Sequence, residues 1–315
     1  MPSSAIPPSR PLRIGTRGSP LALIQARLVA AGLRSAHGLG EDAVEICVIK
    51  TTGDRVQDRA LSELGGKGLF TKEIEEALLQ GEVDLAVHSM KDVPTILPPG
   101  LIIDCLLPRE DPRDAFISRV ASSLGDLPGG AKVGSSSLRR QAQVKALRPD
   151  LEIVPFRGNV DTRLEKLERG DVAATLLAVA GLTRMGRQDE ITATFTAEEM
   201  LPALAQGAVG VQRREDDQRM AGLLTPLHER ATGICVAAER GFLIELDGSC
   251  RTPIAGLATL DGDQVSFRGQ VLTVDGARSV EVERAGSADA AEALGRAAGE
   301  EVRAQAGPGF FMDEA

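Results

Sequence analysis

Short apolar segments alternate with amphipathic segments along the first two thirds of the chain, and this alternation limits the folds open to it. Residues 12–16 (LRIGT) are typical of a strand, and residues 19–37 continue as a helix with Ser19 as N-cap and Pro20 in its first turn. Strand–helix units of this kind predict a parallel α/β sheet. The other expected strands are 44–52, 84–90, 151–156 and 172–182, the last running into a turn, with helices at 69–81 and 159–170 and a strand–turn–helix unit at 131–150.

A Pro-rich stretch at 93–100 interrupts the alternation, and a second domain is expected to start near Pro108. The openings RIGTRGSPLALIQA and KVGSSSLRRQAQ look alike: a strand ending in Gly, hydroxyl residues in the turn, and Leu followed by Gln-Ala in the helix. A distant internal duplication and the chance similarity of a common motif both explain the likeness.

The pattern changes at about residue 230. Residues 231–246 read as a helix, and DG turns between alternating runs at 254–286 predict antiparallel hairpins. The tail is expected to form a helix capped by Ser287. Together these features predict a small α+β domain.

Net charge restricts the partners of the chain, which has 315 residues, 36 of them basic and 45 acidic, and a formal charge of −9. This balance argues against general binding to nucleic acid or to an anionic membrane. The longest apolar run, 172–182, is well short of the ~20 residues that span a bilayer, and the N-terminal tail lacks an apolar signal segment. We expect a cytoplasmic protein, and a monomer by default.

The four cysteines show no metal-binding spacing, and no metal is expected. Cys47, Cys105 and Cys235 fall in apolar segments and should pack as small hydrophobic residues. Cys250 is different, because it lies in a loop (DGSCRTP) beside Arg251, a setting that lowers a thiol pKa. A nucleophile and a free structural cysteine are the two interpretations of Cys250.

Arginines gather at turns and helix starts next to predicted strand ends, where open α/β sheets bind ligands. One carboxylate needs one or two arginines, so this set indicates a ligand with several acidic groups; ordinary surface charge is the alternative. Phosphate is disfavoured because LGGKGLFTK has Leu61 in place of the first P-loop glycine and no hydroxyl residue directly after Lys67. The arginines are Arg17, Arg139, Arg140, Arg157, Arg163 and Arg184.

Lys91 and Asp92 directly follow a predicted buried strand, in the place where α/β enzymes keep catalytic groups. The carboxylate of Asp92 is suited to stabilising a cation or passing a proton, and a loop salt bridge is the alternative. His88 reads as a hydrogen-bonded structural residue. The Gly-rich LGGKGLF is a candidate lid, with Phe70 offering a ring.

Eight motifs taken together resemble one family, hydroxymethylbilane synthase, also called porphobilinogen deaminase. They occur in order from residue 12 to the C-terminal domain, and a run of this kind is far more specific than any one of its members. The motifs are RIGTRGSPLAL, GGKGLFTKEIE, DLAVHSMKDVP, REDPRDAF, VGSSSLRRQ, RGNVDTRL, LAVAGLTRMG and DGSCRTPIAG.

The resemblance implies an enzyme that joins four porphobilinogen molecules head to tail, with loss of ammonia from each. It implies a dipyrromethane cofactor held by a thioether to Cys250, and Asp92 as the catalytic carboxylate. Each pyrrole ring brings an acetate and a propionate, which accounts for the number of arginines. The residues implied to bind cofactor and substrate are Arg17, Ser19, Lys91, Ser135, Ser137, Arg139, Arg140, Arg157, Arg163, Arg184 and Gln206, with Lys67 and Phe70 in the lid.

The implied fold is α/β: two periplasmic-binding-protein-like doubly wound domains, with the site in the cleft between them, plus a small α+β C-terminal domain with an antiparallel sheet. The expected bounds are 1–107 with 208–227, then 108–207, then 228–315, which carries the cofactor cysteine. The chain returns to the first domain through 201–216.

This sequence departs from the family pattern at two positions in the returning segment. Ala205 stands where the family commonly has Gly, and Gln212 stands where an acidic residue is common. The departures bear on the behaviour of the hinge and on the contacts of Gln206.

The alternative function is a two-lobed carboxylate-binding sensor or solute-binding protein, which would need the arginines and no catalysis. Asp92 and Cys250 separate the two hypotheses, because a binding protein needs neither a catalytic carboxylate nor a reactive thiol.

Overall fold

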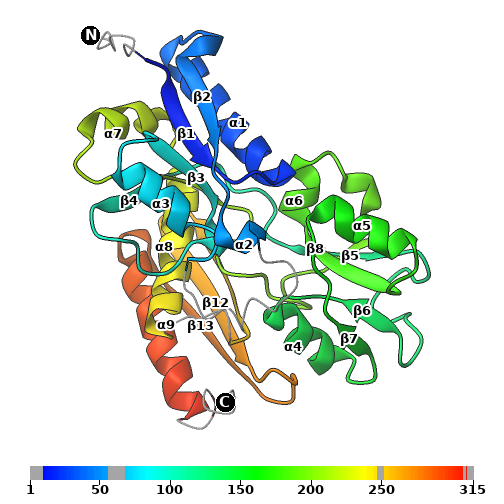
Figure 1. Cartoon of the computed structure of the whole chain (residues 1–315). Coiled ribbons are helices and arrows are strands. Elements are labelled where there is room, and N and C mark those ends of the chain that lie inside the picture. The colour runs from blue at the N-terminus through cyan, green and yellow to red at the C-terminus, as the bar shows by residue number, and fades with distance from the viewer. Residues whose placement is uncertain (1–9, 56–67, 247–251, 308–309, 311–315) are drawn as a thin grey trace. The chain divides into compact units, whose positions relative to one another are not determined.

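The computed structural model describes residues 10–55, 68–246, 252–307 and 310 (Figure 1). Among these, one compact unit comprises residues up to 109 together with 208–233, and a second comprises 110–207 together with 234–310. They are called here the first and the second unit. The division of the chain into three domains with the bounds given above stays a prediction.

The first unit is built around a five-stranded sheet. Its strands are β1 (Leu12–Thr16), β2 (Val44–Val48), β3 (Leu85–Ser89), β4 (Leu101–Leu106) and β10 (Val209–Arg214). They lie in the order β2-β1-β3-β10-β4, with β1 parallel to β2 and β3 and with β10 antiparallel to β3 and β4. The same unit contains helices α1 (Pro20–His37), α2 (Thr52–Arg55), α3 (Lys72–Leu79) and α7 (Gln218–Leu224), with 3-10 turns η1 (Glu41–Ala43), η2 (Met90–Asp92) and η4 (Thr225–Leu227).

The second unit begins with a sheet of the same design. Its strands are β5 (Asp114–Ser118), β6 (Lys132–Gly134), β7 (Glu152–Val154), β8 (Ala174–Ala178) and β9 (Ala193–Thr194). Their order is β7-β6-β8-β5-β9, with β6 parallel to β7 and β8 and with β5 antiparallel to β8 and β9. The accompanying helices are α4 (Leu138–Leu147), α5 (Val160–Glu168), α6 (Val179–Arg184) and the 3-10 turn η3 (Gln188–Glu190). The two sheets match strand for strand, which favours internal duplication over chance similarity.

Both sheets are mixed, so the prediction of a parallel sheet holds for β1, β2 and β3 and for β6, β7 and β8 but not for the pairs made by β5 and β10. β5 and β10 are the strands by which the chain enters each sheet after leaving the other unit. Neither is joined to its neighbours by the strand–helix–strand crossover that goes with parallel pairing. The doubly wound α/β class itself is confirmed.

Helix α1 shows why the opening segment folds as its sequence indicates. The N–H of Ala22 donates to the Ser19 side-chain oxygen at 3.3 Å, and the helix ends at Gly38, whose φ of 61° is left-handed. Ala26, Val29 and Leu33 recur at helical spacing on the buried face, where they join the core of the first sheet. The predicted N-cap is confirmed.

Several helix and strand boundaries in the structure differ from the predicted ones. Residues 172–182 form β8 followed at once by helix α6, not by a turn. The helix expected at 69–81 begins only at Lys72, because Gly68, with a φ of 83°, starts a turn whose carbonyl accepts from Thr71 and Lys72. Ser287 precedes a 3-10 turn and makes no side-chain capping bond, so its predicted capping role is wrong.

The C-terminal part of the second unit is a three-stranded antiparallel sheet packed against helices, as predicted. Its elements are α8 (Arg230–Glu245), whose first four residues belong to the first unit, β11 (Ile254–Asp261), β12 (Gln264–Leu272), β13 (Ser279–Ser287), η5 (Ala288–Ala290) and α9 (Ala291–Ala306). Phe242 of α8 and Phe267 of β12 meet in its core with ring centroids 5.1 Å apart. Gly295 brings α9 against the backbone of α8, since a Cβ there would overlap the carbonyl oxygen of Ala238.

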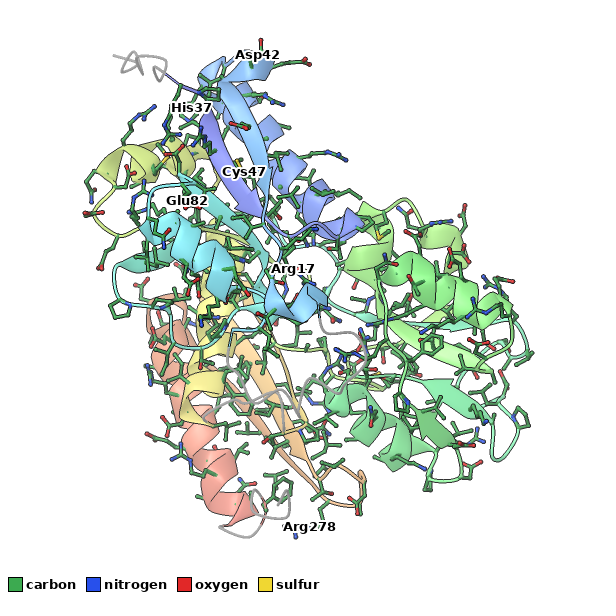
Figure 2. The ribbon with its side chains drawn as sticks, viewed as in Figure 1. Arg17, His37, Asp42, Cys47, Glu82 and Arg278 are labelled. Carbon is green, nitrogen blue, oxygen red and sulfur yellow. The ribbon has the colours of Figure 1, made fainter. Side chains whose placement is uncertain are left out.

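Cys105 and Cys235 are buried, as expected of small hydrophobic residues, whereas Cys47 on β2 is only partly buried (Figure 2). Burial raises the pKa of the Cys105 thiol to about 12, so this group stays protonated. In the part of the chain that the structure describes, no helix combines the length and apolarity needed to cross a membrane.

We predict that Gly295→Ala lowers the free energy of unfolding by about 1–3 kcal/mol, because the added methyl group overpacks the contact between α8 and α9. Gly222→Ala is the matched control, since Gly222 lies in α7 with open space around its Cα. Helix propensity alone should stabilise that variant by up to about 1 kcal/mol. Urea denaturation measures both, and equal effects would contradict the close packing inferred for Gly295.

Candidate functional site

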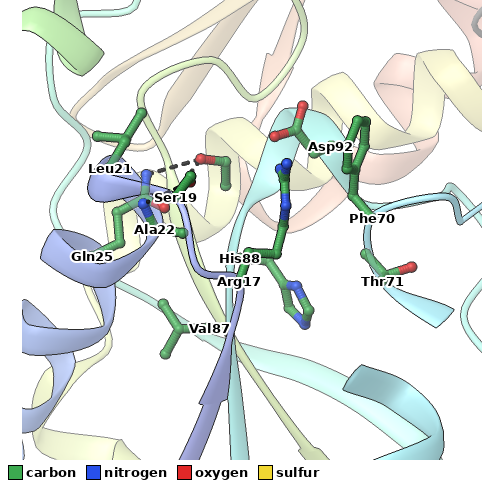
Figure 3. A pocket seen from close by; sticks show the side chains of 11 residues that line it. Arg17, Ser19, Leu21, Ala22, Gln25, Phe70, Thr71, Val87, His88 and Asp92 are labelled. Atoms are coloured by element: carbon green, nitrogen blue, oxygen red, sulfur yellow. Dashed lines mark hydrogen bonds between the residues drawn. The ribbon is translucent and has the colours of Figure 1, made fainter. Parts of the chain in front are cut away.

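A pocket lies at the carboxyl ends of β1 and β3, entirely within the first unit (Figure 3). Arg17 and Ser19 reach it from the turn between β1 and α1, and Asp92 reaches it from the turn after β3. The location is the one where open α/β sheets bind ligands. Its lining residues are Arg17, Ser19, Leu21, Ala22, Gln25, Phe70, Thr71, Val87, His88, Ser89 and Asp92.

Arg17 is held beneath the ring of Phe70, with its guanidinium carbon 4.0 Å from the ring centroid. Figure 3 shows the guanidinium extending toward Asp92 as well. The ring occupies a place that only glycine at position 53 permits, because a Cβ on Gly53 would overlap it. The geometry therefore combines a cation, an aromatic ring and a carboxylate at the mouth of one pocket.

Asp92 and Lys91 belong to the 3-10 turn η2, and both side chains are exposed. Asp92 lines the pocket, whereas Lys91 is not among the residues that line it. Ser89, at the end of β3, is fixed by Gln25 of α1, whose Nε2 donates to the Ser89 hydroxyl at 2.8 Å. The start of the turn that carries Asp92 is thus tied to the first helix.

His88 is a buried, hydrogen-bonded residue, as predicted. Its Nε2 lies 2.9 Å from Oε1 of Gln212 on β10. Burial lowers the pKa of His88 to about 4, and the charge of Arg17 acts in the same direction, against the opposing effects of Gln212 and Asp92. His88 is therefore a neutral imidazole at physiological pH.

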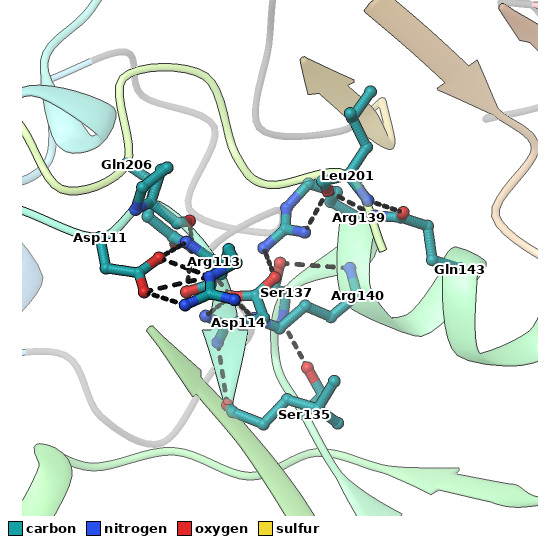
Figure 4. Close-up of polar contacts among 12 residues, drawn as sticks. Asp111, Arg113, Asp114, Ser135, Ser137, Arg139, Arg140, Gln143, Leu201 and Gln206 are labelled. Carbon is teal, nitrogen blue, oxygen red and sulfur yellow. Dashed lines mark hydrogen bonds and ion pairs between the residues drawn. The ribbon is translucent and has the colours of Figure 1, made fainter. Parts of the chain in front are cut away.

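A second group of charged residues surrounds Asp114, the first residue of β5, within the second unit (Figure 4). Nη2 of Arg139 lies 2.7 Å from Oδ2 of Asp114, and Nη2 of Arg140 lies 2.6 Å from Oδ1. Arg139 also donates to the carbonyl of Leu201, and Arg140 to that of Leu176. Asp114 is fully buried, and each arginine is only 6% exposed.

The side chains of Asp114, Arg139 and Arg140 form an ion triad, in which the opposite charges stabilise one another in a buried setting. Burial by itself would raise the pKa of Asp114, but the charges of Arg139 and Arg140 hold it well below its ordinary range. Burial lowers the pKa of Arg139, and Arg140 adds to that effect. One carboxylate faces two guanidiniums, so the triad keeps one net positive charge.

Gln206 contacts the same carboxylate. Its neighbour Ala205 has a backbone conformation to which glycine is better suited. Nε2 of Gln206 donates to Oδ1 of Asp114 at 2.9 Å and to the carbonyl of Pro112 at 2.7 Å. Ala205 has a φ of 59°, a left-handed conformation that costs a residue with a side chain about 1–2 kcal/mol. Its N–H donates to the buried carboxylate of Glu239 on α8, which also accepts from the N–H of Ala258.

Arg157 and Arg163 lie close enough to Arg140 for their charges to interact. Burial and, to a smaller extent, the charges of Arg140 and Arg157 together lower the pKa of Arg163 to about 10. Nη1 of Arg157 is buried and has no hydrogen-bond partner in the described part of the chain, and Nε of Arg163 donates to the carbonyl of Gly158. Arg184 donates to the carbonyl of Gly207 at 2.7 Å, and burial lowers its pKa.

The two serines predicted in the second unit stand at the start of α4. Ser137 caps the helix by accepting from the N–H of Arg140, and buried Ser135 accepts from the N–H of Ser137 at 3.2 Å. The serine-rich turn thus aims the first turn of α4, with its two arginines, at Asp114.

The predicted site residues fall into two groups. Arg17, Ser19, Phe70, Lys91 and Asp92 belong to the first unit, and the remaining described residues belong to the second. Lys67 and Cys250 lie outside the described residues, so their roles stay predictions.

Sequence reasoning missed Asp114 and Gln25. A signal existed for Asp114, because it directly precedes the apolar run at 115–117, and an acidic residue at the start of a buried strand requires a partner. Gln25 gave none, since a glutamine within an amphipathic helix is ordinary.

We predict that Asp114→Asn lowers the free energy of unfolding by about 3–5 kcal/mol at neutral pH, because it leaves two buried guanidiniums without their counterion. The pKa of Asp114 is depressed in the folded state, so its contribution is complete above the ordinary value of 3.8 and is lost as the pH falls below it. The variant should therefore lose less stability than the wild type on acidification.

Urea denaturation at neutral and acidic pH measures both effects. Asp171→Asn is the control, since its exposed partner Arg169 makes a surface ion pair worth at most about 1 kcal/mol. A loss at Asp114 no larger than that of the control would refute the structural role of the triad.

Two solved structures resemble the chain at low sequence identity. A periplasmic substrate-binding protein of an ABC transporter from Coxiella burnetii is 17% identical, with a TM-score of 0.44, over 70% of this chain and 93% of that one. The methionine-binding protein MetQ is 12% identical, with a TM-score of 0.44, over 69% of this chain and 89% of that one. Neither comparison bears on the ligand of this chain.

The sequence comparisons are far closer. The family model "Porphobilinogen deaminase, dipyromethane cofactor binding domain" matches residues 12–222, and "Porphobilinogen deaminase, C-terminal domain" matches residues 233–304. A porphobilinogen deaminase from Paracoccus denitrificans is 58% identical over 304 residues, which is 96% of this chain and 97% of that protein. The motifs, the sheets and these matches agree, and the chain belongs to the porphobilinogen deaminase family.

Proposed function

We propose an assignment of residues to the reaction of this family, in which porphobilinogen molecules are joined head to tail, with release of ammonia, to give hydroxymethylbilane. The chain is a transferase of tetrapyrrole biosynthesis, porphobilinogen is its substrate, and dipyrromethane is its cofactor. In our assignment Asp92 is the catalytic carboxylate, Cys250 holds the cofactor through a thioether, and the arginines bind pyrrole carboxylates.

The observation that carries the assignment is the excess positive charge around Arg163. The charges of Arg140 and Arg157 both act against the charge of Arg163. Among the described residues, the ion pairs of these three arginines include only that of Arg140 with Asp114. Such a cluster is unfavourable in a buried setting unless anions complete it. The side-chain carboxylates of a polypyrrole supply charges of the required sign.

Unpartnered donors in the second unit test whether its residues fit the cofactor. Nε of Arg139 and Nη1 of Arg157 are buried without a hydrogen-bond partner among the described residues. Buried donors of this kind are rare in folded proteins, and an acceptor that arrives with a ligand satisfies them. Arg139, Arg157 and Arg163 therefore fit a polycarboxylate, with Ser135, Ser137, Arg184 and Gln206 supporting them.

The first unit supplies the chemistry in this proposal. Arg17, Ser19 and Lys91 hold the carboxylates of the incoming porphobilinogen, and the ring of Phe70 covers Arg17. Loss of ammonia leaves a cation on the substrate, and the carboxylate of Asp92 stabilises it and exchanges protons with the pyrrole N–H. Bound dipyrromethane supplies the pyrrole end to which the substrate is joined.

Lys67 is assigned to the lid with Phe70. We further propose that the protein works as a monomer in the cytoplasm and binds neither nucleic acid nor membrane. The formal charge of −9 supports the last point, because polyanions would be repelled by the surface as a whole. The alternative of a non-catalytic solute-binding protein is not favoured, since both halves of the chain match the enzyme family.

The thioether assignment predicts that the intact mass of the denatured protein exceeds the mass of its sequence by two condensed pyrrole rings. Cys250→Ala should lose the excess, and Cys47→Ala, at a partly buried cysteine, should keep it. Electrospray mass spectrometry of the three proteins gives the answer. Active wild-type protein with an unmodified mass would eliminate the covalent cofactor.

The role given to Asp92 predicts that Asp92→Asn lowers kcat by about 10²–10³-fold, because the amide cannot balance the charge of the substrate cation. Unfolding temperature should be unchanged, since the side chain is exposed. Asp42→Asn, in an exposed turn far from the pocket residues in sequence, is the control and should keep full activity (Figure 2). Ammonia release measures turnover, and a nearly normal rate for Asp92→Asn would refute the role.

A further inference from the structure

The turn between β12 and β13, residues 273–278, contacts the middle of α4 within the second unit (Figure 1). Gly276 lies at the point of contact, because a Cβ on it would overlap the carbonyl oxygen of Ala142 and would be 2.7 Å from the backbone nitrogen of Ala146. Ala142 and Ala146 are four residues apart, so their carbonyl and N–H groups form one of the hydrogen bonds of the helix. A residue without a side chain at position 276 therefore lets the turn lie directly against the backbone of α4.

Internal hydrogen bonds give this turn a defined shape. Oδ1 of Asp275 accepts from the hydroxyl of Thr273 at 2.6 Å and from the N–H of Ala277 at 3.0 Å. The N–H of Gly276 donates to the carbonyl of Thr273 at 2.9 Å, and the N–H of Thr273 donates to the carbonyl of Arg278 at 3.0 Å. Gly276 has a φ of 72°, which glycine adopts without a steric cost. A turn of fixed shape can hold the helix that it contacts.

The part of α4 that the turn contacts is continuous with the residues proposed to bind the cofactor. Arg139 and Gln143 precede Ala142 and Ala146 by three residues each, and residues at this spacing are neighbours on a helix surface. Nη1 of Arg139 donates to the carbonyl of Leu201 at 2.8 Å, and the amide of Gln143 binds both the carbonyl and the N–H of Leu201. Nε of Arg139 is buried and has no hydrogen-bond partner among the described residues. A shift of α4 would move this donor.

The C-terminal sheet reaches the same group of residues at a second place. The N–H of Gly256 on β11 donates to the carbonyl of Pro202 at 3.0 Å, and a Cβ on Gly256 would be 2.7 Å from the side chain of Leu204. Pro202 directly follows Leu201, to which α4 is bound. The sheet therefore contacts both α4 and the segment that α4 holds.

We propose that Gly276 is a positioning residue for the reaction: its contact holds α4 against the C-terminal sheet, so that Arg139 and Arg140 meet the carboxylates of the bound dipyrromethane and of the growing chain. The proposal rests on the function proposed above, in which these arginines bind pyrrole carboxylates. Asp114 fixes the first turn of α4, and Gly276 fixes the helix beyond that turn. Two separate points of attachment set the direction of a helix, which one point does not.

The variant Gly276→Ala tests the contact, and Gly262→Ala is its matched control. Both glycines lie in hairpin turns of the same sheet and have left-handed φ values of 72° and 58°, so alanine meets similar backbone strain at each. Open space surrounds a Cβ at position 262, whereas a Cβ at position 276 meets the backbone of α4. A difference between the two variants therefore reports on the contact and not on the strain.

We expect Gly276→Ala to speed amide hydrogen exchange in residues 138–147 by about tenfold, because α4 loses an attachment. We expect kcat to fall about tenfold with the KM for porphobilinogen unchanged, because misplaced arginines disturb the bound chain while the first unit still holds the incoming substrate. The share of protein that carries the two-ring mass excess should also fall. Gly262→Ala should match the wild type in all three measurements, made by peptide mass spectrometry, ammonia release and intact mass.

A second variant acts on the shape of the turn without adding bulk. Asp275→Ala removes the oxygen that accepts from Thr273 and Ala277. Hydrogen exchange in α4 should become faster and kcat should fall, as in Gly276→Ala but to a smaller extent. This variant tests the proposal even where Gly276→Ala fails to fold.

Three results would overturn the proposal. Equal exchange of α4 in Gly276→Ala and Gly262→Ala would eliminate the contact. Faster exchange with the kcat and mass excess of the control would show a purely structural contact, and a raised KM with an unchanged kcat would place the effect at the incoming substrate. Failure of the proposed function is seen separately, as an Arg139→Leu enzyme with normal kcat and mass excess.

Discussion

The shared carboxylate of Asp114 is the interaction on which the second sheet depends. Two guanidiniums from the first turn of α4 and one amide from the returning segment converge on it, from places far from Asp114 in the sequence. The carboxylate fixes the first turn of α4 and the returning segment that holds Gln206. Because one negative charge faces two positive ones, the arrangement keeps one net positive charge. In the function proposed above, the same arginines serve both the structure and the binding of carboxylates.

The first sheet has the same strand order but distributes its charges differently. At the end of β3 the carboxylate of Asp92 is exposed, whereas Asp114, at the start of β5, is sealed in. Beside Asp92, buried His88 is hydrogen-bonded to Gln212, which in turn donates to Glu75. The first sheet therefore carries an exposed carboxylate, and the second carries an excess of positive charge around Asp114. In the function proposed above, a substrate that carries carboxylates and becomes a cation uses both.

Local signals in the sequence were sufficient for much of this. Ser19 and Pro20 marked the start of α1, the DG turns marked the hairpins, and apolar periodicity marked the strands. Arg17 and Asp92, both at predicted strand ends, line one pocket. The features that could not be predicted depend on segments far apart in the chain. They are the direction of β5 and β10, the burial of Arg139 and Arg140 against Asp114, and the hydrogen bond that the N–H of Ala205 donates to Glu239. Periodicity carries no information about such partners.

The place of β10 bears on the order in which the chain can fold as it is synthesised. β10 lies between β3 and β4, so the first sheet lacks an interior strand until residue 214 has left the ribosome. The sheet of the second unit is complete by residue 194, within one continuous stretch of sequence. Synthesis therefore delivers a closed second sheet while the first still exposes the edges of β3 and β4, a state in which unpaired strands invite aggregation. The α/β sheet whose synthesis begins first is therefore completed second.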